Sequence, residues 1–387
     1  MKKIKLFEAF AGIGSQYKAL KNISKDKKWD IEVVGIVEWY VDAIIAYLAI
    51  HHNLKHIKKD KTTINSLSLN SKDLITERQF NNLQNTEKAF FINKSKELCN
   101  NLFDITKVTY KEMPKDIDIF TYSFPCQDLS QQGKQRGMTR DTRSGLLFQI
   151  DRILSEMKKN YSINDLPKYL LLENVTNIVS KRHLSSYNKW LDKLRRLGYE
   201  SKTYVLNSRN FGSPQNRVRT FCISVRKDFK EKVNFSFPEF ENIDKKNKKI
   251  KSILEKEVDE KYYMNNLMTY SKTDEKKSKN GLIKSYLKNY TNFNSEAYLY
   301  SIEGKGPTLT ASGANSRIKI WINNRIRRLT PLEAYLYMGF KKQDFNNVNR
   351  LEILNERQMV FTAGNSISVE ALEGIFNSFK FRNKKLL

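Results

Sequence analysis

Short apolar segments of strand character alternate with stretches of helical periodicity along the first 228 residues of the chain. Residues 3–7 alternate polar and apolar side chains, which is the pattern of a strand, and residues 15–22 continue as a helix. Three further strand–helix pairs are predicted at 31–37 and 41–51, at 117–122 and 145–157, and at 169–172 and 190–197, followed by strands at 202–206 and 220–225. Strands that alternate with helices predict an α/β protein with a largely parallel, doubly wound sheet.

The pattern changes after residue 227. Residues 241–280 are rich in Lys, Asn and Glu with little periodicity, and residues 286–320 are first aromatic and then rich in Gly, Ser and Thr. A helical pattern resumes where Thr330 can cap a helix and Pro331 occupies its first position. Since the length suits two domains, we predict a large domain and a smaller inserted one, with the limits 1–228 and 326–387 for the large domain and 229–325 for the insert.

The charge of the chain predicts a polyanionic partner. Lys and Arg number 69 against 42 Asp and Glu, a formal net charge of +27, and such a field attracts nucleic acid. The chain is also rich in Lys, Asn and Ile, as AT-biased coding would produce, so part of the lysine surplus can be unrelated to a ligand. The apolar runs are too short for a membrane span and no signal peptide is recognisable, so we expect a cytoplasmic protein.

The cysteines and histidines predict no metal site. The cysteines are few and lack a Cys-x-x-Cys pair, which suits a reducing compartment, and they have no zinc-ligand spacing with the histidines. Free cysteines are usually small buried hydrophobes, which is our interpretation of Cys99 and Cys222. Cys126 differs, because Pro125 ends the predicted strand before it and polar residues follow. Such a position can lower the pKa of a thiol and make it a nucleophile.

Four candidate functional residues each follow a predicted strand. They are Gly12, Glu38, Cys126 and Glu173. In a doubly wound sheet the ligand crevice lies outside the carboxyl ends of the strands. The sequence therefore predicts that these residues meet at one rim of the sheet.

The segment Phe10-Ala11-Gly12-Ile13-Gly14 is a glycine turn between a strand and a helix, where the backbone can approach a ligand. Tyr17 stands where a dinucleotide fingerprint would have its third glycine, which disfavours a nicotinamide cofactor. Glu38 follows the next strand and is placed to bind ribose hydroxyls, and Trp39 can stack on adenine. Taken alone, this turn is equally compatible with a purely structural role.

A thiol, a carboxylate and two arginines follow one another along the chain at Cys126, Glu173, Arg217 and Arg219. A thiolate that adds to carbon 6 of cytosine makes carbon 5 nucleophilic, and a protonated carboxyl can meet the charge that develops at nitrogen 3. Glu173 can hold that proton only if burial raises its pKa. Arg219, with Arg217 nearby, can bind the exocyclic oxygen or a phosphate. Considered separately, a turn at Glu173 and a solvated basic strand end at the arginines are ordinary alternatives.

In this order the motifs resemble those of the DNA (cytosine-5) methyltransferases. The resemblance covers residues 7–14, 38–39, 104–105, 125–127, 173–175, 215–219, 327–340 and 364–369. It implies a Rossmann-like domain that binds S-adenosyl-L-methionine, with an inserted target-recognition domain. It also implies methyl transfer to carbon 5 of a cytosine that is flipped out of duplex DNA and joined to Cys126. The cofactor residues implied are Phe10, Ala11, Gly12, Ile13, Gly14, Glu38, Trp39, Asp104, Ile105, Pro125, Leu146, Asn365 and Ser366.

The resemblance also implies two segments that contact DNA. One is the polar loop from Gln127 to Arg143, which closes on DNA in the family and includes Ser130. The other lies in the insert, where small and polar side chains can approach base edges; its candidates are Thr308, Leu309, Ser312, Asn315 and Arg317. Residues 293–296 and 308–319 are similar to bacterial CpG-specific members, which predicts a CpG target.

Three alternatives compete with this function. A deaminase would need His-x-Glu and Pro-Cys-x-x-Cys, whereas position 129 is Leu129 and no histidine precedes Glu by two residues. A tRNA cytosine-5 methyltransferase shares the motifs, but the long insert argues against it. A catalytically silent DNA-binding protein is disfavoured by the intact catalytic motifs. We expect a monomer that acts on double-stranded DNA, and a cognate restriction endonuclease remains open as a partner.

Overall fold

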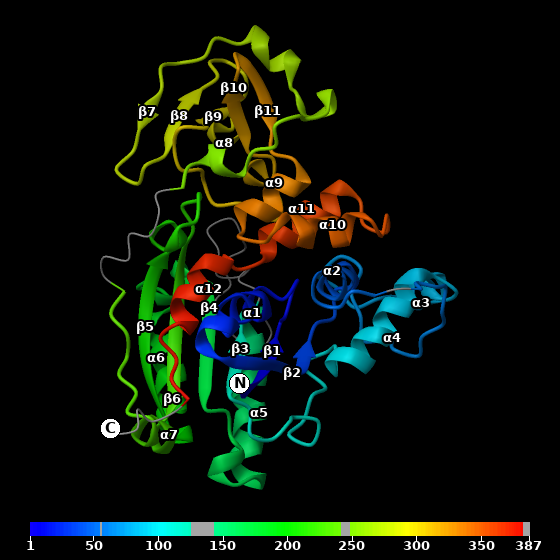
Figure 1. Ribbon diagram of the computed structural model, residues 1–387, viewed down its shortest axis with the longest axis vertical. Helices are drawn as coiled ribbons and strands as arrows, with labels where there is room; N and C mark the ends of the chain where they lie inside the picture. The colour runs from blue at the N-terminus through cyan, green and yellow to red at the C-terminus, as the bar shows by residue number, and fades with distance from the viewer. Residues whose placement is uncertain (55, 125–142, 241–247, 382–387) are drawn as a thin grey trace.

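The computed structural model describes residues 1–54, 56–124, 143–240 and 248–381. Its larger part is built on a six-stranded sheet with the strand order β2-β1-β3-β4-β6-β5 (Figure 1). The bounds of these strands are β1 Lys2–Ala9, β2 Trp29–Val37, β3 Ile119–Tyr122, β4 Tyr169–Val175, β5 Tyr199–Asn207 and β6 Val218–Arg226. The α/β class and the doubly wound sheet predicted from the pattern are confirmed.

One strand of this sheet runs against its neighbours. Strands β2, β1, β3 and β4 are mutually parallel, whereas β6 is antiparallel to both β4 and β5. The first residues of β6 therefore lie beside the last residues of β4, with Arg219 opposite Val175. Because β6 is reversed, its first residues lie at the rim where the parallel strands end.

Alternate side chains of the strands enter two hydrophobic cores, one on each face of the sheet. Phe7, Phe120 and Leu170 pack with α5 and α6. Ile4, Leu6 and Leu171 belong to the opposite core, which includes α1, α2, α4 and α12. The helices of the large part have the bounds α1 Ser15–Lys27, α2 Val41–His51, α3 Glu77–Leu83, α4 Glu87–Cys99, α5 Leu147–Asn160, α6 Leu184–Leu197, α7 Lys227–Lys232 and α12 Val369–Phe376.

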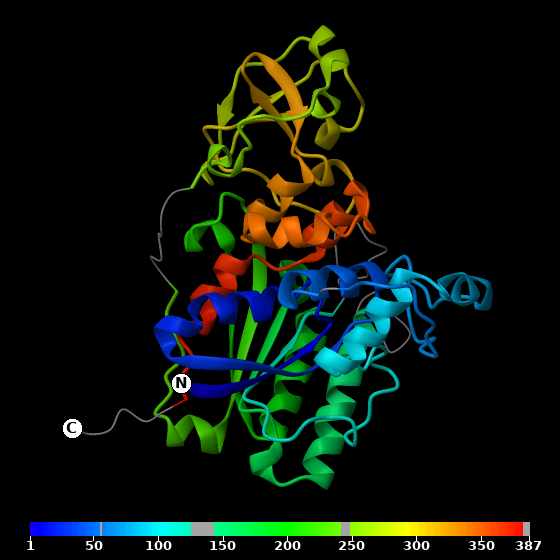
Figure 2. The same cartoon turned by 45° about the vertical axis from the view of Figure 1, so that its right-hand side comes forward.

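A second, smaller sheet lies above the large one in both views, with the strand order β11-β10-β9-β8-β7 (Figures 1 and 2). Helices α9, α10 and α11 lie between the two sheets. The bounds in this part are β7 Lys276–Lys277, β8 Ile283–Tyr286, α8 Asn294–Ala297, β9 Tyr298–Ser301, β10 Lys319–Ile322, β11 Arg325–Arg328, α9 Pro331–Tyr337, α10 Lys342–Asn349 and α11 Glu356–Asn365. Helix α12 then packs against α1, so the chain returns to the large sheet.

The start of the predicted insert packs against the large sheet, and its end belongs to the small sheet. At its start, the rings of Phe229 and Phe235 pack 5.6 and 5.4 Å from the ring of Tyr169 in the large sheet. At its end, β11 pairs with β10 in the small sheet. The domain limits 229 and 325 stay a prediction.

Within the described ranges, no helix combines the length and the apolar character needed to cross a bilayer. The same ranges contain no cluster of three or more His, Cys, Asp or Glu side chains arranged to hold a metal ion.

Candidate active site

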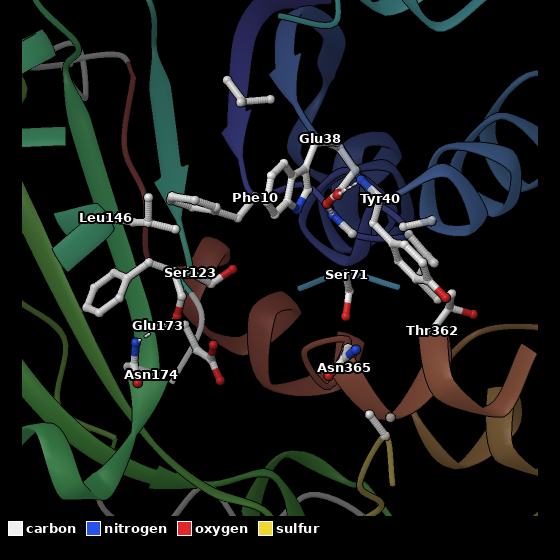
Figure 3. Close-up of a pocket in the computed structure, with 18 of the residues that line it drawn as sticks. Phe10, Glu38, Tyr40, Ser71, Ser123, Leu146, Glu173, Asn174, Thr362 and Asn365 are labelled. Atoms are coloured by element: carbon white, nitrogen blue, oxygen red, sulfur yellow. Dashed lines mark hydrogen bonds between the residues drawn. The ribbon is translucent and has the colours of Figure 1, made fainter. Parts of the chain in front are cut away.

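A cavity of about 630 Å³ opens at the rim where the parallel strands end. Its volume is in the range of sites that enclose a cofactor-sized ligand. Many of the predicted residues line it: Phe10, Gly12, Ile13, Glu38, Trp39, Asp104, Ile105, Leu146, Glu173, Arg217, Arg219, Leu309 and Asn365. Figure 3 shows several of them around one space, with Phe10 and Glu38 on one side and Glu173 and Asn365 on the others.

Some predicted residues do not line the cavity. Ala11, Gly14 and Ser366 are buried behind its wall. Pro125, Cys126, Gln127 and Ser130 lie outside the described residues, as does the side chain of Arg143. Their predicted roles stay predictions.

The glycine turn approaches the cavity with an unusual backbone. Phe10, Gly12 and Gly14 all have positive φ angles, of 60°, 56° and 75°. A methyl group on Gly14 would lie 2.3 Å from Nε2 of His51, so there is no room for a side chain there. At Gly12 a side chain would meet open space instead. The turn therefore presents backbone to the cavity on one side and contacts α2 closely on the other.

Glu38 joins the glycine turn to the end of β2. Its Oε2 accepts a hydrogen bond from the Gly12 amide at 2.8 Å, and its Oε1 accepts one from the Tyr40 amide at 2.8 Å. Burial raises the pKa of this carboxyl, and these backbone donors oppose the shift. Each carboxylate oxygen has a second lone pair, so the group can still accept the two hydroxyls of a ribose.

Asn101 holds Glu38 in place and was missed by the sequence interpretation. Its Oδ1 accepts from the Glu38 amide at 3.1 Å and its Nδ2 donates to the Glu38 carbonyl at 3.0 Å. A single buried asparagine between α4 and β3 carries no pattern that marks such a role. Ser71, Lys72, Tyr40 and Thr362 also line the cavity without having been predicted.

The residues around this half of the cavity fit S-adenosylmethionine. Phe10, Trp39 and Ile105 provide apolar and aromatic surface for an adenine, and the buried Glu38 carboxylate provides an acceptor for ribose hydroxyls. Asn365 ends α11 with an exposed side chain at the cavity, where it can bind a polar group.

Glu173 and Arg219 form an ion pair at the other half of the cavity. Nε of Arg219 lies 3.3 Å from Oε1 of Glu173, because the antiparallel β6 places Arg219 beside the end of β4. Glu173 is 8% exposed, and this burial raises the pKa of its carboxyl, whereas the charges of Arg219 and Arg217 act in the opposite direction. Burial thus favours the protonated form of Glu173, and the two arginines favour the ionised form.

Asn174 links the end of β4 to the start of the segment that contains Cys126. Its Nδ2 donates to the Phe124 carbonyl at 3.1 Å, and its Oδ1 accepts from the Val175 amide at 2.9 Å (Figure 3). Asn174 is 2% exposed, so both bonds are shielded from water. From the sequence, Asn174 is predicted only as part of the motif at 173–175.

Arg217 contacts backbone carbonyls of two distant segments. Its guanidinium donates to the Leu309 carbonyl at 2.8 Å, to the Ser366 carbonyl at 2.7 Å and to the Gly364 carbonyl at 3.4 Å. These bonds tie the start of β6 to the insert and to the end of α11. These described contacts of Arg217 are to backbone, whereas Arg219 pairs with the acid; the predicted catalytic role of Arg217 stays a prediction.

The residues predicted to contact DNA divide into two groups. Thr308 Oγ1 donates to the Asn216 carbonyl at 2.6 Å and the Leu309 amide donates to Gln215 Oε1 at 3.2 Å, so this pair docks the insert on the loop before β6. Leu309 is 1% exposed, and its side chain is part of the core and of the cavity wall. Ser312, Asn315 and Arg317 lie farther out, with Ser312 and Arg317 exposed.

The fold and the cavity define the class of S-adenosylmethionine-dependent methyltransferases. Among solved structures, the chain is similar to Entamoeba histolytica methyltransferase EhMeth, with a TM-score of 0.62, 14% identity and 98% of each chain covered. It is also similar to Dnmt2 methyltransferase of S. pombe, with a TM-score of 0.59, 17% identity, and 97% of this chain and 98% of that one covered. At such identities the similarity shows the fold.

Sequence comparison identifies the family. The model of the C-5 cytosine-specific DNA methylases matches residues 79–380. The chain is 46% identical to the orphan methyltransferase M.SssI of Spiroplasma monobiae, with 97% of both chains covered. It is 33% identical to the type II methyltransferase M2.ScrFI of Lactococcus lactis subsp. cremoris, with 96% of this chain and 98% of the relative covered. The chain belongs to the C-5 cytosine-specific DNA methylase family.

The predicted activity and cofactor are thereby confirmed. The protein is a DNA (cytosine-5-)-methyltransferase with S-adenosylmethionine as its methyl donor. Its substrate is DNA, which agrees with the net charge of +27. The family assignment favours this activity over the tRNA-methylating and the catalytically silent alternatives.

Proposed function

We propose that the enzyme methylates a flipped cytosine in duplex DNA by a covalent route, with Cys126 as the nucleophile and Glu173 as the proton donor to nitrogen 3. The observation that carries this proposal is the buried Glu173–Arg219 pair in the wall of the cofactor cavity. The bond from Asn174 to the Phe124 carbonyl supports it, because Phe124 lies two residues before Cys126.

The Cys126 thiolate adds to carbon 6, and the electron pair of the ring is taken up as nitrogen 3 receives a proton from Glu173. Carbon 5 is then nucleophilic and forms the new carbon–carbon bond. When bound, S-adenosylmethionine would supply the methyl group, with its sulfur–methyl bond breaking and S-adenosylhomocysteine as the leaving group. Loss of the carbon 5 proton to a base, return of the nitrogen 3 proton to Glu173 and departure of the thiolate from carbon 6 then restore the aromatic ring.

Arg219 has two functions in this proposal. Its charge keeps Glu173 oriented through the 3.3 Å contact, and its remaining guanidinium donors can bind the exocyclic oxygen of the cytosine or a phosphate. The base must leave the helix to reach this cavity, since carbon 6 is inaccessible within stacked DNA.

Replacement of the thiol tests the proposal. Cys126→Ser should abolish transfer of labelled methyl groups to DNA, while binding of DNA in a gel shift and binding of S-adenosylhomocysteine by calorimetry survive. Cys99→Ala is the matched control, because Cys99 is buried beside His52 and should be dispensable for chemistry. Methylation retained by Cys126→Ser would remove this thiol from the mechanism.

We also propose CpG as the target. The support is the similarity of residues 293–296 and 308–319 to bacterial CpG-specific members, together with the exposure of Ser312 and Arg317 on the insert. Bisulfite sequencing of plasmid DNA treated with the enzyme should show protection of cytosine in CpG and in no other dinucleotide. Protection spread over other dinucleotides would contradict the proposal.

We further propose that the enzyme acts as a monomer in the cytoplasm; in support of a monomer, residues from both parts of this chain line the cavity described. Light scattering coupled to size exclusion should give a mass near 45.5 kDa without DNA. A cognate restriction endonuclease remains open as a partner, and co-purification from native cells tests for it.

A further inference from the structure

Glu8 is a fully buried carboxylate that the proposed chemistry does not use. It lies in β1 with 0% of its surface exposed and does not line the cavity. Its Oε2 accepts a hydrogen bond from the Tyr47 hydroxyl at 2.8 Å and its Oε1 accepts one from the Tyr17 amide at 3.2 Å. A buried carboxylate is costly to maintain, so its partners indicate what it does.

The Tyr17 amide belongs to the first turn of α1. The first amides of a helix have no partner within it, and a side chain at the N-cap usually accepts one of them. The N-cap of α1 is Gly14, which has no side chain to do so. Glu8 therefore caps α1 from the neighbouring strand, and a carboxylate at this end of a helix is also favoured by the helix dipole.

Two residues of α2 complete the support beneath the glycine turn. Nε2 of His51 lies 3.1 Å from the Ile13 carbonyl. The ring of Tyr47, whose hydroxyl binds Glu8, packs 4.7 Å from the ring of His51. We refer to Glu8, Tyr47 and His51 as the bracket. It holds the turn at its last two residues, Ile13 and Gly14.

The opposite side of the same turn forms the cavity wall. Phe10, Gly12 and Ile13 line the cavity, and the Gly12 amide donates to Glu38. There is no space between Gly14 and the bracket, since even a methyl group would lie 2.3 Å from His51 Nε2. A displacement of the bracket therefore displaces the wall.

We propose that Glu8 is a positioning residue for the cofactor: its buried acceptor oxygens fix the glycine turn from behind and so set the affinity for S-adenosylmethionine. The inference rests on the proposed role of this turn as the cofactor-binding wall. Glu8 acts through the turn and does not touch the ligand.

Glu8 can keep its contacts with the Tyr47 hydroxyl and the Tyr17 amide whether it is charged or neutral. Burial raises the pKa of Glu8 to about 7, against the effect of the bonds from Tyr47 and Tyr17. In the protonated acid, Oε1 can still accept from the Tyr17 amide while the Tyr47 hydroxyl accepts the new proton. A glutamine can make the same two contacts, whereas a leucine of similar size can make neither.

The test compares Glu8→Leu with Glu8→Gln in binding of S-adenosylhomocysteine, measured by calorimetry. Loss of a cap corresponds to about a tenfold change in an equilibrium constant, so Glu8→Leu should weaken binding by about tenfold. Glu8→Gln should restore the affinity to within about threefold of the wild type. In turnover, Glu8→Leu should raise the KM for S-adenosylmethionine with little change in kcat at saturating cofactor.

A substitution in the core on the other face of the sheet separates a specific effect on cofactor affinity from a general loss of stability. Leu194→Ala removes a fully buried side chain of α6 in the core on the other face of the sheet. It should lower the unfolding temperature without changing the affinity for S-adenosylhomocysteine. Wild-type affinity in a folded Glu8→Leu protein would overturn the inference, as would failure of Glu8→Gln to restore binding.

Glu38→Ala distinguishes this inference from the predicted role of the glycine turn in binding S-adenosylmethionine, on which the methyl transfer of the proposed function depends. If Glu38→Ala binds S-adenosylhomocysteine like the wild type, the turn is not the cofactor wall and the underlying proposal fails. If Glu38→Ala loses affinity and Glu8→Leu does not, only the positioning role of Glu8 is wrong.

Discussion

The side-chain amide of Asn174 donates to the backbone carbonyl of Phe124 at 3.1 Å, and this bond connects two adjacent parallel strands at their carboxyl ends. Asn174 follows the proposed proton donor Glu173, and Phe124 precedes the proposed nucleophile Cys126 by two residues. One hydrogen bond thus sets the start of the thiol segment relative to the acid.

Asn174→Asp tests this relationship. The aspartate keeps the acceptor for the Val175 amide but loses the donor to the Phe124 carbonyl. We expect kcat to fall by up to about a hundredfold, because a displacement of about 1 Å between reacting groups has an effect of that size. Affinity for S-adenosylhomocysteine should not change. An unchanged kcat in single-turnover assays would show that the bond does not position the thiol.

Glu173→Gln tests the proton donor. Glutamine has nearly the same shape and remains beside Arg219, but it cannot deliver a proton to nitrogen 3. We expect kcat to fall by about 10² to 10⁴-fold with intact binding of cofactor and DNA. Wild-type turnover in this variant would exclude Glu173 as the donor.

The pH dependence of turnover gives a second test of the same residue. Burial raises the pKa of Glu173, and the protonated form is the active one in our proposal. Turnover of the wild type should therefore decrease as the pH rises through this elevated pKa. The residual activity of Glu173→Gln should lack that decrease. Rates at saturating substrate across the pH range measure both profiles.

Arg217 and Arg219 should differ in what their loss changes. Arg217 donates to one carbonyl of the insert and to two at the C-terminal end of α11, so Arg217→Ala leaves buried acceptors without this partner. We expect a loss of about 1–3 kcal/mol in the free energy of unfolding. Arg219→Ala should instead lower kcat with a smaller effect on stability. Equal effects of the two substitutions in urea unfolding and in turnover would contradict this division.

The sequence predicted the sheet and the residues at its rim because both depend on local signals. Apolar alternation marks the strands, and a polar or glycine residue after each strand marks the rim. The direction of β6 carries no such signal, because a period of two is the same in either direction. The contact between Arg219 and Glu173 follows from that direction and could be predicted only from the family resemblance.

Contacts between distant segments were the least predictable part of the site. Arg217 and the pair Thr308-Leu309 looked like catalytic and DNA-contacting groups, yet their described bonds join the insert to the large sheet. Asn101 was not predicted for the same reason. Its bonds to Glu38 depend on the packing of two elements that are far apart in sequence.

The stability of the enzyme should depend on pH through Glu8. Burial raises the pKa of Glu8 from 4.5 to about 7, so the folded state binds a proton more tightly than the unfolded state. The resulting stabilisation is complete below about pH 4.5 and is lost as the pH rises to about 7. Relative to Glu8→Gln, which does not titrate, the wild type should lose about 3 kcal/mol of unfolding free energy over this range.

Urea unfolding of the wild type and of Glu8→Gln at several pH values measures this difference. The titration of the unfolded chain at all other groups is the same in both proteins and cancels from this difference, and in the folded state four groups near Glu8 have pKa values shifted away from this window. Burial lowers the pKa of His51 to about 3 and raises that of Cys99 to about 12, and it raises the pKa values of Tyr17 and Tyr47. A constant difference between the two proteins from about pH 5 to about pH 8 would show that Glu8 does not titrate there.

The covalent step is the central claim, and trapping it is the most direct test. In DNA that contains 5-fluorocytosine at the target, the fluorine cannot leave carbon 5 as a proton does, so the enzyme should remain joined to carbon 6 after methyl transfer. A denaturing gel should show a protein–DNA complex with the wild type and S-adenosylmethionine, and none with Cys126→Ser. If active enzyme gives no such complex, or if Cys126→Ser still forms it, addition of the Cys126 thiolate to carbon 6 is contradicted.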